Sequence, residues 1–444
     1  MIKKLQFVLL FSRSFIIKHK KFIIIGGISG FLSVLFFISS YSFFSGFPIK
    51  SYKKIGIVGK FTEESLPLFI LNKISFGLTS LTPEGDAIPS LAESWKTDDN
   101  GTNYTFSLRS DLYWHDGTNF TATDVNYLLK GMTITAVDKT TVSIKLQDLY
   151  APLPVIVSRP IVKENFTGLG LYKVTKVKYT GDTLTGLSLS PQKENLPYII
   201  YKFYSNLDDA LLAYKLGEID ILEGVSSTGN LDNWKNSKVS KITLYDRYVG
   251  IFFNLKDPLF KEKETRQALA YATPSIDDYE KAYSPISPLS WAYSEKIRLY
   301  RFDPETARKI LTKSPIASST TQITLSTYTS FLHTAQTIID AWRKIGINAK
   351  IKVETSIPSD FQILLISQII PPDPDQYQYW QSTQESTNLT HYSNLRIDKL
   401  LEDGRRTLDK ETRKGIYADF QRYLVDDAPV IFLYYPKVYR VERK

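Results

Sequence analysis

The stretch Ile88–Val125, IPSLAESWKTDDNGTNYTFSLRSDLYWHDGTNFTATDV, carries the densest structural signals in this 444-residue chain. Within it, Tyr104, Phe106 and Leu108 alternate with polar residues, which predicts a strand with one buried face. The turn-forming residues Asp98–Gly101 come directly before this alternation. The first part of the stretch therefore predicts a tight turn followed by a half-buried strand.

A second turn and a helix start follow in the same stretch. Trp114-His-Asp-Gly117 closes the next extended piece, and Thr121 stands three residues before Asp124. This spacing is typical of a capping box, in which two side chains bond the backbone at the start of a helix. We therefore predict a helix that opens here and continues through 125–129. Strand, turn, strand and capped helix indicate a folded α/β or α+β segment.

Three motifs of this stretch occur together in one known family. They are Pro89-Ser-Leu-Ala-Glu-Ser-Trp95, the Tyr-x-Phe-x-Leu-Arg strand that ends at Arg109, and Trp114-His-Asp-Gly117 leading to Ala122-x-Asp124-Val125. In these motifs the chain resembles the family 5 extracytoplasmic solute-binding proteins of peptide- and nickel-type ABC importers. The resemblance implies an α/β, two-lobed, periplasmic-binding-protein-like fold of type II. It also implies the peptide-binding class of that fold, which has an extra small β-rich subdomain.

The resemblance spans about residues 52 to 436 and implies domain boundaries. It places 52–250 and 428–444 in the first lobe, with the small subdomain at about 86–165, and 251–427 in the second lobe.

The resemblance also places the passages between the lobes. In relatives the strand that here ends at Asn254 crosses into the second lobe, so we expect a hinge there. A second crossing is expected near Asp427–Pro429, because in relatives the last strand, here Val430–Tyr435, returns to the first lobe.

Hydrophobic periodicity predicts further elements of both lobes. Alternation and helical spacing in Ile323–Val353 indicate strand, helix and strand, and a unit of this length favours parallel strands. A strand at Tyr198–Tyr204 precedes a helix that Ser205 and Asp208 would cap.

Two more helix starts are marked by aspartates. Asp303 stands before a proline at the first helical position, and Asp409 precedes an apolar helical stripe.

Charge is concentrated at the N-terminus. Six basic residues and no acidic residue lie in 1–21, so these account for six of the nine net positive charges and leave +3 for the rest. With a net charge of only +3, residues 22–444 show no excess of basic residues of the kind that binds phosphates. This argues against nucleic acid as a partner. The absence of cysteine excludes disulfides, thiolate metal sites and a lipid-modified cysteine anchor.

The uncharged run Phe22–Phe44 predicts a membrane anchor. Its twenty-three residues could cross a hydrocarbon core of about 30 Å, and Lys18, Lys20 and Lys21 directly before it place residues 1–21 in the cytoplasm. We therefore expect a single-pass protein of the cell membrane with its large domain outside. The alternative is a cleaved signal peptide with a site at Ser40–Ser42, but the run is longer than a usual signal core.

Catalytic motifs are absent from the sequence. The four histidines are scattered, and there is no H-E-x-x-H motif and no G-x-S-x-G elbow, so we expect no enzyme activity, no metal and no cofactor. His115 beside a glycine turn is typical of a structural histidine. The glycines Gly168 and Gly170 lack the rest of a phosphate loop and indicate a tight re-entry of the chain.

The function that we infer is a membrane-anchored, extracytoplasmic receptor that delivers a peptide-like or other small organic ligand to an ABC permease. Two lobes would close on the ligand, and we expect a monomer. One alternative is a sensing or adhesion ectodomain on the same fold. The other is a secreted hydrolase that uses Asp373 and Asp375 as a carboxylate pair.

Candidate ligand-binding residues come from two polar loops and the expected hinge. They are Thr62, Glu63, Asn254, Asp373, Asp375, Tyr377 and Trp380.

The resemblance also bears on the charge of the ligand. Peptide-binding relatives use an aspartate just before the Asp-Pro-Asp segment for the peptide's amino group, and here that stretch is Ser367–Pro372. The stretch 320–339 supplies no Arg or Lys for a carboxylate. Because an unpaired charge in a closed cleft costs several kcal/mol, we predict a neutral or singly charged, partly apolar ligand. It would be held by Tyr377, Trp380 and the loop at Thr62 and Glu63.

Overall fold

The computed structural model describes residues 16–44, 51–98, 100–128, 131–312, 314 and 322–444. The chain divides into two compact units, Met1–Tyr52 and Lys53–Lys444. The main element of the first unit is helix α2 (Lys20–Phe44). Among the described residues, no helix is both long enough and apolar enough to cross a membrane, so the structure does not support the predicted anchor.

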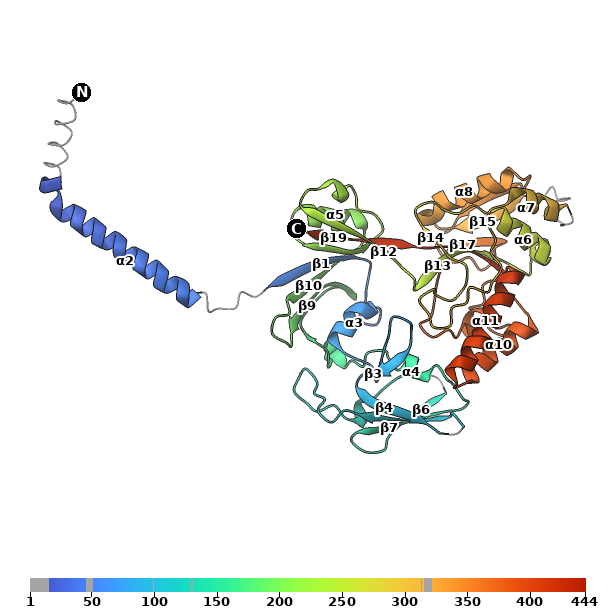
Figure 1. Ribbon diagram of the computed structural model, residues 1–444, viewed down its shortest axis with the longest axis horizontal. Coiled ribbons are helices and arrows are strands. Elements are labelled where there is room, and N and C mark those ends of the chain that lie inside the picture. Colours follow the sequence, from blue (N-terminus) through green and yellow to red (C-terminus); the bar gives the residue numbers. More distant parts are fainter. Residues whose placement is uncertain (1–15, 45–50, 99, 129–130, 313, 315–321) are drawn as a thin grey trace, which may run out of the picture. The chain divides into compact units, whose positions relative to one another are not determined.

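The first sheet of Lys53–Lys444 has seven strands. In spatial order they are β12 (Ser237–Thr243), β19 (Lys437–Arg443), β11 (Ile221–Val225), β1 (Tyr52–Val58), β10 (Tyr198–Tyr204), β9 (Thr183–Pro191) and β8 (Tyr172–Thr180) (Figure 1). Helices α3 (Leu68–Ile74) and α5 (Leu207–Lys215) belong to this lobe. The cap of α5 is Asn206, whose side chain accepts from the Asp209 amide at 2.9 Å, and not the predicted Ser205 or Asp208.

A four-stranded antiparallel sheet forms the small β-rich subdomain that was predicted. Its order is β4 (Ala92–Thr97), β5 (Asn103–Leu108), β7 (Thr141–Leu146) and β6 (Met132–Ala136); the hairpin β2 (Thr79–Leu81) and β3 (Ala87–Pro89) precedes it, and α4 (Leu153–Ile156) follows. The side chains of β5 alternate between buried and half-buried, as predicted. Thr121 and Asp124 do form a capping box, but the helix that they open ends after one turn, Ala122–Asp124.

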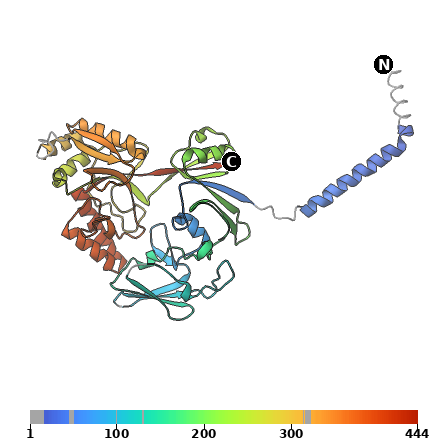
Figure 2. The ribbon, with the colours of Figure 1, turned by 180° about the vertical axis from the view of Figure 1, so that it is seen from behind.

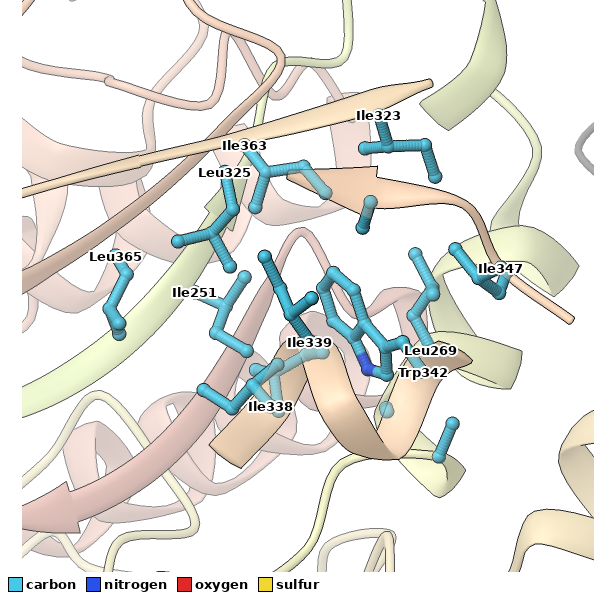
Figure 3. Close-up of a cluster of buried hydrophobic side chains, with 14 of the residues drawn as sticks. Ile251, Leu269, Ile323, Leu325, Ile338, Ile339, Trp342, Ile347, Ile363 and Leu365 are labelled. Carbon is cyan, nitrogen blue, oxygen red and sulfur yellow. The ribbon is translucent and has the colours of Figure 1, made fainter. Parts of the chain in front are cut away.

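The second sheet has six strands and lies between two layers of apolar side chains. Its order is β14 (Glu280–Lys281), β18 (Val430–Tyr435), β13 (Arg247–Phe253), β17 (Ile363–Ile369), β15 (Ile323–Thr327) and β16 (Ala349–Val353). On β13, Val249 and Ile251 enter one core while Tyr248 and Phe252 enter the other, since successive side chains of a strand point to opposite faces. Figure 3 shows the first core around Trp342, whose indole nitrogen donates to the Thr273 hydroxyl at 3.1 Å.

Helices cover this second sheet. They are α6 (Lys263–Tyr271), α7 (Pro304–Leu311), α8 (Leu332–Arg343), α9 (Tyr377–Trp380), α10 (Leu395–Arg406) and α11 (Lys410–Asp427), of which α10 and α11 pack side by side (Figure 2). The predicted β-α-β unit is confirmed, because β15 pairs with β16 in parallel. The caps at Asp303 and Asp409 are also confirmed, with oxygens 3.0 and 2.8 Å from the backbone nitrogens that they accept from.

The passages between the two sheets differ from the expected ones. Both β13 and β18 pair within the second sheet, so Val430–Tyr435 does not return to the first lobe; β19 does. The chain therefore crosses at Leu244–Asp246, between β12 and β13, and at Pro436, between β18 and β19. These crossings touch, because the Leu244 amide donates to the Pro436 carbonyl at 2.8 Å. Asn254 lies at the far end of β13.

His115 joins two turns of the first lobe. Its Nε2 lies 2.9 Å from the Gly170 carbonyl, its backbone amide donates to the Gly168 carbonyl at 2.9 Å, and burial lowers the pKa of its imidazole. A Cβ at Gly168 would lie 2.1 Å from the Ile74 carbonyl oxygen, so only glycine fits this approach. The predicted structural histidine and tight re-entry are both confirmed.

Candidate functional site

The polar loop after β1 is held by its own side chains. The Thr62 amide donates to the Ser65 hydroxyl at 2.7 Å, and the Tyr179 hydroxyl donates to the Glu63 carboxylate. Two of the predicted ligand contacts, Thr62 and Glu63, are thus engaged in fixing the loop. The next side chain, Glu64, is exposed and forms no hydrogen bond or ion pair with the described residues.

The backbone of the turn after α4 is bonded by a half-buried tyrosine, Tyr127. The Tyr127 hydroxyl lies 2.7 and 3.1 Å from the carbonyl oxygens of Val157 and Arg159, and it accepts from the Leu78 amide at 3.1 Å. Burial raises the pKa of this hydroxyl, which keeps it neutral. The backbone of Arg159 is therefore held in place while its guanidinium is exposed, and no acidic side chain among the described residues pairs with it.

These two charged side chains line one groove of the first lobe. A cavity of about 670 Å³ runs between α3 and the turn after α4 and reaches Pro372 of the second lobe. A second cavity of about 660 Å³ adjoins it. The two share five lining residues: Glu64, Leu71, Ile156, Arg159 and Pro160. We call the two cavities together the first-lobe groove.

A smaller cavity lies where the chain crosses between the lobes. Its volume is about 320 Å³, and we call it the crossing cavity. It is lined by Leu81–Gly85 from the first lobe, by the crossing Thr243–Asp246, and by Ser287, Leu289, Ser290 and Ile370–Pro372 from the second lobe. Leu81 and Pro372 line both this cavity and the first-lobe groove, so the two spaces are neighbours.

The predicted acidic pair is locked inside the second lobe. Asp373 accepts from the Arg413 guanidinium at 2.7 and 3.2 Å, and both side chains are buried. Burial raises the pKa of Asp373, an effect that the Arg413 charge opposes. Asp375 accepts from Arg405 at 2.8 Å, and the ring of Tyr377 lies 3.8 Å from that guanidinium. These contacts fix the loop 371–375 and leave neither carboxylate free for acid–base chemistry.

The two remaining predicted residues lie away from these cavities. Trp380 is 2% exposed in the second core of that lobe. The Asn254 side chain is buried; it donates to the Phe361 carbonyl at 2.8 Å and accepts from the Lys256 amide at 3.0 Å. The structure thus brings Asp373, Asp375 and Tyr377 together and separates them from Asn254.

Comparison with protein families identifies the chain. The model of the bacterial extracellular solute-binding proteins, family 5 Middle, matches residues 86–133 and 129–388. The chain belongs to this family. Family 5 proteins bind solutes and are not enzymes, so this one is an extracytoplasmic solute-binding protein.

Curated relatives of this family 5 protein agree with the assignment. It is similar to the oligopeptide-binding protein AppA of Bacillus subtilis, with 27% identity over 424 residues that cover 78% of each chain. It is also similar to di/tripeptide-binding protein 1 of Pseudomonas aeruginosa, with 24% identity over 447 residues that cover 80% of this chain and 82% of the relative.

Solved structures show the same fold. The ABC transporter substrate-binding protein CtaP of Listeria monocytogenes matches with a TM-score of 0.77 at 22% identity, over 89% of this chain and 94% of that one. AppA of Bacillus subtilis in complex with a nonapeptide matches with a TM-score of 0.67 at 22% identity, over 89% and 95% of the two chains. The two-lobed α/β architecture of this family 5 protein is therefore established.

Sequence reasoning missed Glu64 and Arg159 in this family 5 protein. The loop that carries Glu64 was selected, but one position too early. No sequence signal marked Arg159, which follows a short helix of the small subdomain.

Proposed function

We propose that this family 5 protein binds a peptide-like or other small organic ligand between its lobes and delivers it to the permease of an ABC transporter. The observation that carries the proposal is the crossing cavity, because both lobes and the crossing itself line it. A ligand there touches both lobes only when they are close together. Ligand binding would then favour the closed form by a population shift.

Relatives support the class of ligand. Several of them carry peptide-binding names, and the structure of AppA holds a nonapeptide. Of the residues predicted to hold the ligand, we propose that Thr62 and Glu63 shape the wall of the first-lobe groove. We propose that Asp373, Asp375 and Tyr377 fix the loop whose Pro372 reaches the crossing cavity.

Small-angle X-ray scattering of the purified full-length protein tests the closing mechanism. Native mass spectrometry first identifies any ligand that copurifies, and scattering then compares the liganded and unliganded protein. We expect a smaller radius of gyration with ligand and a mass that corresponds to a monomer. An unchanged profile at saturating ligand would contradict the closing mechanism.

We also propose that the protein stays attached to the membrane through Phe22–Phe44. The support is the uncharged run and the lysines before it, because charge-free segments of this length partition into bilayers and lysines stay on the cytoplasmic side. Membranes washed with alkaline carbonate should retain the protein. Release into the wash, or a mature N-terminus near Phe43, would contradict the attachment.

A further inference from the structure

Two opposite charges line the part of the first-lobe groove that its two cavities share, while Glu63, Lys163 and Glu164 line the second cavity alone. Only Glu64 and Arg159 are charged among the residues that line the cavity of about 670 Å³. They are also the only charged residues among the five that both cavities of the groove share. Glu64 and Arg159, which are far apart in the sequence, therefore line the same part of the groove with opposite charges.

Neither the Glu64 carboxylate nor the Arg159 guanidinium has a hydrogen-bond or ion-pair partner among the described residues. Within the described residues, Glu64 has no hydrogen bond or ion pair, whereas Ser65 and Tyr179 bond Thr62 and Glu63 of the same loop. Arg159 is held through its backbone carbonyl, and its guanidinium has no acidic partner among the described residues. Asp373 and Asp375, which follow the groove-lining Pro372 in the chain, differ because each has an arginine partner. Of these four side chains, the two without a partner among the described residues are therefore on the first lobe.

We propose that Glu64 and Arg159 are specificity residues, with Glu64 pairing with a cationic group of the ligand and Arg159 with an anionic group. This rests on the proposed function and revises the prediction of a neutral or singly charged ligand, which considered the second lobe alone. A charge-assisted hydrogen bond is stronger than a neutral one, and Arg presents a fork that fits a carboxylate. The ligand carries both charges, as a short peptide with free termini does.

Isothermal titration calorimetry on the full-length protein tests the assignment with a thermodynamic cycle. The probes are the best binder from a library of free-ended di- to pentapeptides, its N-acetylated form and its C-amidated form. For the wild type we expect each blocked form to bind about tenfold more weakly, because one charge-assisted contact is lost. In Glu64→Gln the free and N-acetylated forms should bind alike, and in Arg159→Gln the free and amidated forms should bind alike.

Matched controls remove one charge each outside the groove. Glu93→Gln and Arg301→Gln change exposed side chains that line none of the cavities described above, and they should keep the wild-type preference for free termini. The melting temperature of each unliganded variant confirms that it is folded. If peptides bind and both groove variants keep the wild-type preference, the residue assignment is wrong while the proposed function stands. The residue assignment is also wrong if no peptide of the library binds while a copurified ligand still closes the lobes. If no ligand closes the lobes, the proposed function itself is wrong.

Discussion

Arg413 shows how much a single buried charge can matter in this fold. Its side chain and that of Asp373 are 8% and 6% exposed, whereas Arg422 and Asp419 are 47% and 53% exposed. Arg413→Met leaves a buried carboxylate without a partner, so we expect a loss of about 3–5 kcal/mol in the free energy of unfolding. Arg422→Met should change it by about 0.5 kcal/mol or less. Urea unfolding measures both.

A double variant separates the charge from the packing. Arg413→Met with Asp373→Asn leaves no net charge in the site and should recover part of the loss. If Arg413→Met alone costs no more than Arg422→Met, the carboxylate of Asp373 is not sealed from water.

Lys281 gives a prediction for pH. Burial lowers the pKa of its ammonium from 10.5 to about 8. Between these values the unfolded chain binds more protons than the folded one, so this group makes stability rise with pH from about 8 to 10.5; below 8 its penalty is complete. Lys281→Met should therefore raise the free energy of unfolding at pH 7 by about 3 kcal/mol.

Comparing wild type with Lys281→Met at several pH values isolates the contribution of the Lys281 charge to the free energy of unfolding. The stability gain from Lys281→Met should shrink as urea unfolding is repeated at increasing pH. Lys350→Met, at an exposed position on β16, serves as the control. A gain that does not depend on pH would mean that packing and not charge is responsible.

At the level of elements, two glycines of the α10–α11 pair should respond in opposite directions to alanine. A Cβ at Gly404 would lie 2.7 Å from the Tyr417 ring, while a Cβ at Gly415 meets nothing within 4 Å. Gly404→Ala should destabilise by about 1–3 kcal/mol through overpacking. Gly415→Ala should stabilise by about 0.5–1 kcal/mol, because alanine loses less backbone entropy in a helix.

Thermal unfolding of the two variants decides the point. Stabilisation by both would show that α10 and α11 can separate at no cost, contrary to the close contact at Tyr417.

The elements also show what the sequence could predict. The strands and helix of Ile323–Val353 were predictable, because apolar periodicity reports which face is buried. The box at Thr121 and Asp124 correctly marked a helix start, yet the helix ends after one turn. A cap signals where a helix begins, whereas its length depends on tertiary packing. Val430–Tyr435 was assigned to the wrong lobe, because the resemblance placed the return to the first lobe one strand too early, at this strand and not at β19.

The site was predictable only in part. The sequence indicated the loop of Thr62 and Glu63, but contacts with Ser65 and Tyr179 decide which side chain of this loop keeps no partner. Glu64 and Arg159 line the same cavity although they are far apart in the sequence, which no local pattern reveals.

At the level of the whole molecule, the lobes also touch away from the crossings. The Lys410 ammonium lies 2.5 Å from the Asp86 carboxylate, the Trp291 amide donates to the Glu84 carbonyl at 3.2 Å, and the Ala151 amide donates to the Arg405 carbonyl at 2.8 Å. The tip of the β2–β3 hairpin thus rests on the second lobe. This contact favours approach of the lobes without any ligand.

Reversing one charge of this contact should open the unliganded protein. Lys410→Glu places two carboxylates together, so we expect a larger radius of gyration without ligand and affinity weakened about two- to fivefold, since such exposed pairs contribute about 1 kcal/mol or less. Adding Asp86→Lys should restore both, and the effect should shrink in high salt. Equal radii for wild type and Lys410→Glu at low salt would contradict the role of the contact.

Strand β19 has a consequence for the order in which the protein can be completed. It lies between β12 and β11, and the entire second lobe is synthesised between β12 and β19. Until β19 leaves the ribosome, β11 and β12 keep unpaired edges, which are prone to pair with other chains. The first lobe therefore finishes folding last, although most of it is synthesised first. A nascent chain that awaits translocation remains incompletely folded until its synthesis is nearly complete.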